Sequence, residues 1–73
     1  MTDKNEFRAE MVRFGDRQED LAAALGIAPV TLSAKINGDR DFTQGEILQI
    51  AIRYNLTAEA VVRIFLPMMS SVA

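Results

Sequence analysis

The amino-acid sequence predicts an all-α fold built from five short helices. Apolar residues recur at helical spacing along the whole chain, and capping or turn residues interrupt them at short intervals. No segment alternates strictly between apolar and polar residues, as a half-buried strand would. With 73 residues the chain has the length of one small domain. We therefore expect a single domain over residues 1–73, in which short connections join the helices.

The first helix is expected over residues 4–14. Its apolar residues Phe7, Met11 and Phe14 follow the spacing i, i+4, i+7, which places them on one face. Gly15 comes directly after the last of them, and glycine at this position commonly ends a helix.

The second helix is expected to begin after Asp16 and to end at Gly26. Asp16 is interpreted as its N-cap, and Glu19 stands three residues later, in the register of a capping box. The inward-facing stripe consists of Leu21, Ala22 and Leu25.

The third helix is expected to open at Pro29, because proline suits the first helical position, where its missing N–H is no loss. Leu32 and Ile36 stand one turn apart and form its buried face. Asn37 and Gly38 are expected to end the helix, with Gly38 in a conformation of positive φ.

A fourth helix is predicted by Thr43 and Glu46, which have the spacing of a capping box. Phe42 directly precedes the cap and is placed for a hydrophobic staple with Ile47. The apolar face of this helix consists of Ile47, Ile50, Ala51 and Tyr54.

Thr57 is expected to cap a fifth helix that runs to about Leu66, where Pro67 stops it. Its core-facing residues are Val61, Ile64 and Phe65. A second apolar stripe at i, i+4, i+7 consists of Val62, Leu66 and Met69.

Composition excludes several classes of enzyme. The chain has no cysteine and no histidine, so it offers no thiolate nucleophile, no imidazole base, no Ser-His-Asp triad and no zinc site of the usual ligands. Its carboxylates stand mostly in capping positions or on solvated helix faces. We therefore expect a binding module that is not an enzyme and has no metal site, no cofactor and no small-molecule ligand.

The chain is expected to act in the cytoplasm and not at a membrane. Its first residues are polar and no apolar run follows them, which argues against a signal peptide. The longest uncharged apolar stretch, residues 64–69, is far shorter than the roughly 20 residues that a membrane-spanning helix needs. The absence of cysteine is compatible with a reducing compartment.

Residues 17–37 have the pattern of a helix-turn-helix. Ala22 is small where two helices must cross closely, Gly26 makes the tight turn and Ile27 fills the space between the helices. The segment resembles the lambda-repressor-like family, which includes Cro-type and XRE-type regulators of phages and bacteria. The resemblance covers about residues 4–66. It rests on the spacing of Gln18, Leu21, Ala22, Gly26, Ile27, Leu32 and Gly38.

The resemblance implies that the third helix is a recognition helix that enters the major groove of DNA. At 100° per residue, its outer face carries Val30, Ala34 and Asn37, flanked by Thr31, Ser33 and Lys35. The residues expected to contact bases are Val30, Thr31, Ser33, Ala34 and Lys35. Thr31 and Ser33 have an alternative role, which is to hydrogen-bond backbone carbonyls within the helix.

The family often has glutamine or serine at the positions of Pro29, Val30 and Ala34, none of which offers a side-chain hydrogen bond here. Readout is therefore expected to depend on DNA shape, thymine methyl groups, Thr31 and Lys35. The substitution at Pro29 is also expected to remove the side chain that Gln18 braces in the family.

The resemblance assigns phosphate contacts to four residues at helix termini and in the loop after the recognition helix. These are Gln18, Asn37, Arg40 and Thr43. Three neighbouring acids, Glu19, Asp39 and Asp41, would repel DNA. The alternative for Arg40 is an ion pair with Asp39 or Asp41.

A small domain rarely exposes clustered apolar residues without a use. Related domains commonly dimerise through their C-terminal region, so residues 57–73 are expected to form a self-association surface together with the fourth helix. The predicted interface residues are Ile52, Val62, Leu66 and Met69. The alternative is that these residues wrap back over the small core.

Two functions compete at this point. The first is a repressor-like or Cro-like regulator that binds double-stranded operator DNA as a homodimer, and the second is a protein-interaction module on the same fold, such as an anti-repressor or accessory subunit. The pI of about 4.9 favours the second. However, residues 1–20 hold six acids against four bases, whereas residues 21–73 hold four of each. The net charge of −2 is therefore displaced from most of the expected docking face.

Overall fold

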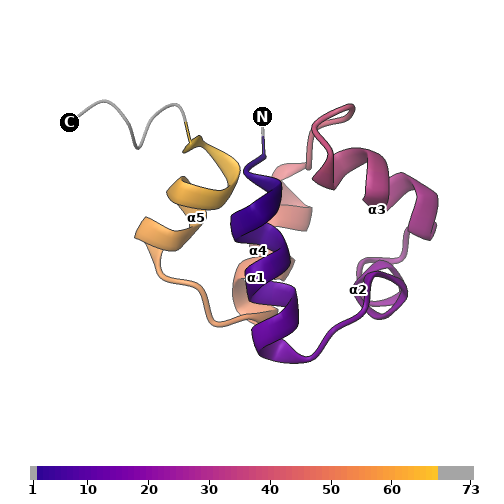
Figure 1. Cartoon of the computed structure of the whole chain (residues 1–73), viewed down its shortest axis with the longest axis horizontal. Helices are drawn as coiled ribbons and strands as arrows, with labels where there is room; N and C mark the ends of the chain where they lie inside the picture. The colour runs from indigo at the N-terminus through magenta and orange to yellow at the C-terminus, as the bar shows by residue number, and fades with distance from the viewer. Residues whose placement is uncertain (1, 68–73) are drawn as a thin grey trace.

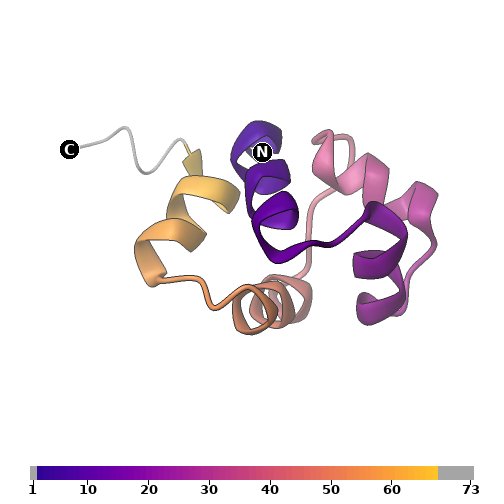
Figure 2. The same cartoon turned by 60° about the horizontal axis from the view of Figure 1, so that its bottom comes forward.

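The structure is a computed structural model that describes residues 2–67. Between these residues the chain forms five helices and no strand, which confirms the predicted all-α fold. The helices are α1 (Lys4–Phe14), α2 (Gln18–Leu25), α3 (Pro29–Ile36), α4 (Gln44–Arg53) and α5 (Ala58–Phe65). Figure 1 shows α5 on one side of α1 and the α2–α3 pair on the other, and Figure 2 shows α4 crossing beneath α1.

Every helix contributes to one hydrophobic core. The residues that form it are Phe7, Met11, Leu21, Ala22, Leu32, Ile36, Ile50, Ile64 and Phe65. The ring of Phe42, from the loop before α4, stacks on Phe7 with the ring centres 5.4 Å apart and meets Phe65 edge-on. Aromatic pairs of this geometry add stability beyond the area they bury. The loop between α3 and α4 is therefore anchored to the core.

Phe14 departs from the predicted apolar face of the first helix. Phe7 and Met11 are buried, whereas Phe14 is 50% exposed. Its ring lies 5.1 Å from the ring of Tyr54 and 4.8 Å from the guanidinium carbon of Arg53. The last turn of α1 thus packs on the end of α4, beyond the core that the two preceding apolar residues reach.

The helix caps follow the prediction at the two threonines. Thr43 Oγ1 accepts the N–H of Glu46, and Glu46 Oε1 accepts the N–H of Thr43 at 2.9 Å, which completes the capping box of α4. Thr57 Oγ1 accepts the N–H of Ala60 at 3.1 Å and caps α5. Both helix starts are therefore set by local sequence.

The predicted cap of the second helix is wrong. The N-cap of α2 is Arg17, and its N–H donates to Oδ2 of Asp20 at 2.8 Å, so Asp20 takes the place expected for Glu19. The side chain of Asp16 is engaged elsewhere, by Arg53 of α4. A tertiary ion pair has therefore overridden the local capping preference of Asp16.

Candidate nucleic-acid interface

The turn between α2 and α3 has the predicted helix-turn-helix construction. Gly26 ends α2 with φ +72°, a left-handed conformation that strongly favours glycine. The N–H of Ile27 donates to the carbonyl of Ala22 at 3.0 Å and closes the turn. Ala22 and Leu32 are fully buried, one in each helix of the pair. The turn therefore fixes the direction in which α3 leaves α2.

Gln18 contacts the start of α3 through the backbone of Pro29 and not through a side chain at that position, as expected from the proline. Its Nε2 donates to the backbone carbonyl of Pro29 at 3.4 Å. A proline lacks the N–H but keeps its carbonyl acceptor, so the glutamine still finds a partner at this position. The first residues of the two helices are consequently linked across the turn.

The outer face of α3 is open, as the helical rotation predicts. Val30 is 76% exposed and Asn37 is also exposed, while Thr31, Ser33 and Ala34 are partly exposed. Within residues 2–67 neither hydroxyl of this face makes a hydrogen bond, so the alternative of bonding backbone carbonyls is not realised. The face therefore offers two free hydroxyls beside two apolar groups.

Lys35 does not lie on this face, and its expected placement on an exposed flank is wrong. Only 6% of the residue is exposed. Its Nζ is hydrogen-bonded to Oε1 of Glu46 and lies 5.9 Å from the centre of the Phe42 ring. Helical rotation places Lys35 beside the outer face, but the loop and α4 cover that flank. The ammonium group is therefore turned away from the surface that would meet bases.

The residues expected to contact phosphate after the C-terminal end of α3 are accessible to solvent. Arg40 is exposed and forms no ion pair within residues 2–67, so the alternative pairing with Asp39 or Asp41 is not seen. Its N–H donates to the carbonyl of Ala34 at 3.3 Å, which fixes its backbone to α3. Thr43 is exposed as well. Its hydroxyl oxygen accepts the cap bond and still has an O–H to donate.

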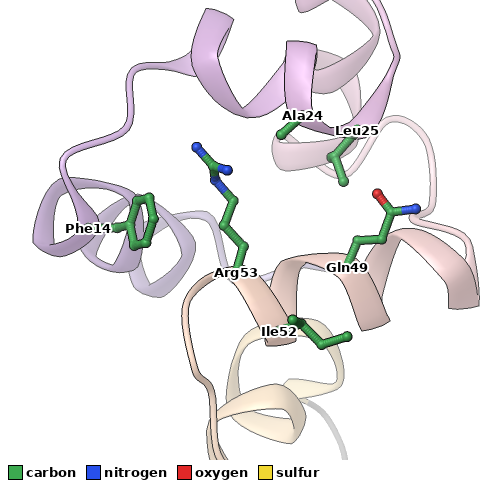
Figure 3. Close-up of a pocket in the computed structure, with 6 residues that line it drawn as sticks. All are labelled: Phe14, Ala24, Leu25, Gln49, Ile52 and Arg53. Carbon is green, nitrogen blue, oxygen red and sulfur yellow. The ribbon is translucent and has the colours of Figure 1, made fainter.

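A second surface feature is an open groove of about 420 Å³ between the ends of α1, α2 and α4. It is lined by Phe14, Ala24, Leu25, Gln49, Ile52 and Arg53. Figure 3 shows Leu25 and Gln49 pointing toward one another from α2 and α4. The groove is mainly apolar, and its lining residues come from α1, α2 and α4 and not from α3.

Two of the four residues predicted for a dimer interface line separate hollows. Ile52 is 71% exposed and lines the groove described above. Leu66 is 45% exposed and lines a different hollow, of about 320 Å³, together with Phe42 and Ile47. Val62 is half-buried. Met69, the fourth predicted residue, lies outside the described part of the chain.

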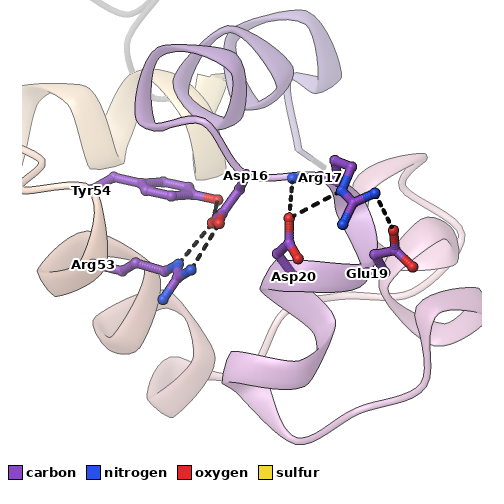
Figure 4. A network of polar contacts seen from close by, with 6 residues as sticks. All are labelled: Asp16, Arg17, Glu19, Asp20, Arg53 and Tyr54. Atoms are coloured by element: carbon purple, nitrogen blue, oxygen red, sulfur yellow. Dashed lines mark hydrogen bonds and ion pairs between the residues drawn. The ribbon is translucent and has the colours of Figure 1, made fainter.

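Sequence reasoning overlooked Arg17 as a possible phosphate ligand. Its side chain is 76% exposed beside Gln18, with Nη1 3.1 Å from Glu19 and Nε 3.5 Å from Asp20 (Figure 4). Exposed ion pairs of this kind contribute little and exchange readily. The signal was present in the sequence, since a base directly precedes the residue assigned to phosphate.

The network around Asp16 was also missed. Its carboxylate accepts two hydrogen bonds from Arg53 and one from the hydroxyl of Tyr54, all at 2.7 Å (Figure 4). The bonds from Arg53 hold the pKa of Asp16 below its ordinary value, although burial opposes this. Burial and the bond to Asp16 raise the pKa of Tyr54. These partners are 37 and 38 residues from Asp16, so local spacing gave no sign of them.

The comparison with protein families supports the interpretation of α2 and α3 as a helix-turn-helix. The sequence model of the helix-turn-helix family matches residues 7–61, which is more than half of the chain. The chain belongs to the helix-turn-helix family. The resemblance to lambda-repressor-like regulators is thus confirmed, and the family is one of DNA-binding transcriptional regulators and not of enzymes.

Two further comparisons of this helix-turn-helix protein find no similar protein. A search of curated proteins and a search of solved structures each give no match. Among the helices of residues 2–67, none is both long and apolar enough to cross a membrane.

Proposed function

We propose that this helix-turn-helix protein is a cytoplasmic, sequence-specific regulator of the repressor or Cro type that binds operator DNA as a homodimer. The observation that carries the proposal is the open outer face of α3, where Val30 is 76% exposed. An α-helix with its side chains is about 10–12 Å across, and the major groove of B-DNA is roughly 12 Å wide. The exposed face of α3 can therefore enter the groove.

Base recognition is assigned to four residues of this face. Val30 and Ala34 would contact thymine methyl groups, since they have no polar side-chain atoms. Thr31 and Ser33 would supply hydrogen bonds, because their hydroxyls are free in this structure and can donate or accept. Lys35 is not included, because its ammonium group is buried on Glu46.

Phosphate contacts are assigned to two clusters that flank α3. Gln18 stands at the first residue of α2, and Thr43 caps α4, so each cluster includes free backbone N–H groups of a helix N-terminus. Arg40 and Asn37 extend the second cluster. Arg17 joins the first when phosphate displaces its exposed carboxylate partners.

The homodimer is proposed because two copies would double a small set of phosphate contacts and would read two half-sites. Ile52 on α4 and Leu66 after α5 are exposed apolar residues that a second copy could cover. Val62 and Met69 complete the proposed interface. An apolar contact of this kind is consistent with a chain whose net charge is only −2.

Selection of binding sites from a random pool of DNA duplexes at low, stated salt tests the proposal. The expected product is a symmetric pair of half-sites that contain thymine, with an affinity that falls linearly in log salt. If no duplex is enriched at low salt, the regulator is excluded. The second candidate, a protein-interaction module, would then rest on the apolar groove lined by Phe14 and Ile52.

A further inference from the structure

A buried ion pair joins the last turn of α3 to the first turn of α4. The side chain of Lys35 is 8% exposed and that of Glu46 is 14% exposed. Oε1 of Glu46 accepts from Lys35 Nζ and also from the N–H of Thr43. One carboxylate oxygen therefore connects the recognition helix to the capping box of the next helix.

The surroundings leave this pair little freedom to move. Nζ of Lys35 lies over the ring of Phe42, and Phe42 stacks on Phe7 in the core with an angle of 11° between the ring planes. Burial disfavours the charged form of Glu46, but the hydrogen bonds from Lys35 and Thr43 outweigh it and lower the pKa of this carboxyl. Glu46 therefore remains ionised near neutral pH.

The two residues of the pair belong to segments that make the two kinds of proposed DNA contact, base contacts on α3 and phosphate contacts at the start of α4. Val30 and Ala34 belong to α3, on the side of Lys35. Arg40 and Thr43 belong to the loop and cap on the side of Glu46. The start of the loop is held to α3 by backbone bonds from Asp39 and Arg40 to the Ala34 carbonyl, at 2.9 and 3.3 Å. The ion pair adds a side-chain connection that joins α3 directly to the cap of α4.

We propose that Lys35 and Glu46 are positioning residues that set the base-reading face of α3 against the phosphate-binding start of α4, without touching DNA themselves. The inference rests on the proposed DNA-binding function. It reverses the role that the sequence suggests for Lys35. It also assigns a favourable role in DNA binding to an acidic residue beside the phosphate site.

The sign of the effect of Glu46→Gln tests the inference. Glutamine keeps the side-chain oxygen for the capping box and removes the charge. Electrostatics alone predicts tighter DNA binding, because a negative charge near phosphate is lost. Loss of positioning predicts binding that is about threefold to thirtyfold weaker. The matched control is Asp41→Asn, at an exposed acid in the loop between α3 and α4, which should bind DNA equally or more tightly. Unchanged or tighter binding by Glu46→Gln overturns the inference.

A double-mutant cycle with Lys35→Met separates positioning from direct contact. If Lys35 acts through Glu46, its replacement weakens binding in the wild-type background and has little effect in the Glu46→Gln background. An equal loss in both backgrounds means that Lys35 touches DNA, and the inference fails. The double variant buries no unpaired charge, so it should fold even if a single variant does not. If a single variant does not fold, the double variant is measured alone. A folded double variant that binds DNA with wild-type affinity refutes the inference. If the wild-type chain binds no duplex, the proposed function itself fails.

Discussion

Asp16 and Arg53 form a two-pronged ion pair in which both oxygen–nitrogen distances are 2.7 Å. Asp16 lies in the turn between α1 and α2, and Arg53 is the last residue of α4. The side chain of Asp16 is only 5% exposed, and the ring of Phe14 covers the guanidinium group. Asp16 stands two residues before Gln18. The pair therefore connects the start of the helix-turn-helix to the C-terminal end of α4.

Replacing Asp16 with asparagine should destabilise the fold substantially. Removing one partner of a buried pair leaves the other charge without compensation, which costs about 3–5 kcal/mol when both are buried. The Arg53 side chain is 32% exposed, so we expect about 2–3 kcal/mol in urea unfolding. The control is Glu19→Gln, which breaks an exposed pair and should change stability by less than about 0.5 kcal/mol. Equal stability of the two variants would contradict a structural role for the pair.

Stability should fall in acid and stay nearly level around neutral pH. The pKa values of Asp16 and Glu46 are lowered in the folded state, so the unfolded chain binds more protons as the pH falls below the ordinary values of 3.8 and 4.5. The chain has no histidine, and little change is expected between about pH 6 and 8.

The free energy of unfolding in urea, measured from acid to neutral pH, checks the prediction. Asp16→Asn should flatten the acid limb of the stability curve, because one of the two carboxyls is gone. The control is Asp39→Asn, which alters an exposed carboxylate and should leave the limb as steep as in the wild type. A steep limb in Asp16→Asn would assign the acid sensitivity to other groups.

The sequence predicted the parts of this fold that depend on local spacing. Apolar periodicity and caps such as Thr43 and Thr57 located the five helices, and the turn at Gly26 located the helix-turn-helix. The residues whose roles the sequence predicted wrongly share one property, which is that their partners are distant in sequence. Asp16 is held by Arg53, and Lys35 is held by a residue 11 positions away. Helical rotation gives the direction of a side chain but not the neighbouring segment that covers it.

Arg40→Gln should weaken binding to all duplexes alike and reduce its salt dependence. Arg40 is exposed and forms no ion pair within residues 2–67, so it is available to a phosphate. Loss of one phosphate contact should lower the slope of log affinity against log salt by about 0.9. The control is Arg63→Gln on α5, which pairs with Glu6 and should leave the slope unchanged. An unchanged slope in Arg40→Gln would remove this residue from the interface.

Val30→Gln should change which operator is preferred. Val30 of α3 is 76% exposed. A glutamine there can bond adenine in the major groove, whereas valine can contact only apolar groups such as a thymine methyl. Repeating the duplex selection with this variant should alter the preferred base at one position of each half-site. Val12→Gln, an equally exposed valine on α1, should select the wild-type sequence. Identical sequences from both variants would place the reading face elsewhere.

Leu66→Glu should shift the proposed dimer toward monomer. Leu66 is 45% exposed beside a hollow that it shares with Phe42, and a carboxylate there would have to lose water when the second copy packs on it. Sedimentation at a fixed concentration measures the shift, and Ile52→Glu tests the groove between the ends of α1, α2 and α4 in the same way. Val12→Glu introduces the same charge at an exposed apolar site outside the proposed interface, so it should sediment like the wild type. Because the two hollows are separate, the variant that dissociates the dimer identifies the hollow that is used. If both variants keep the wild-type mass, neither hollow is the contact between copies.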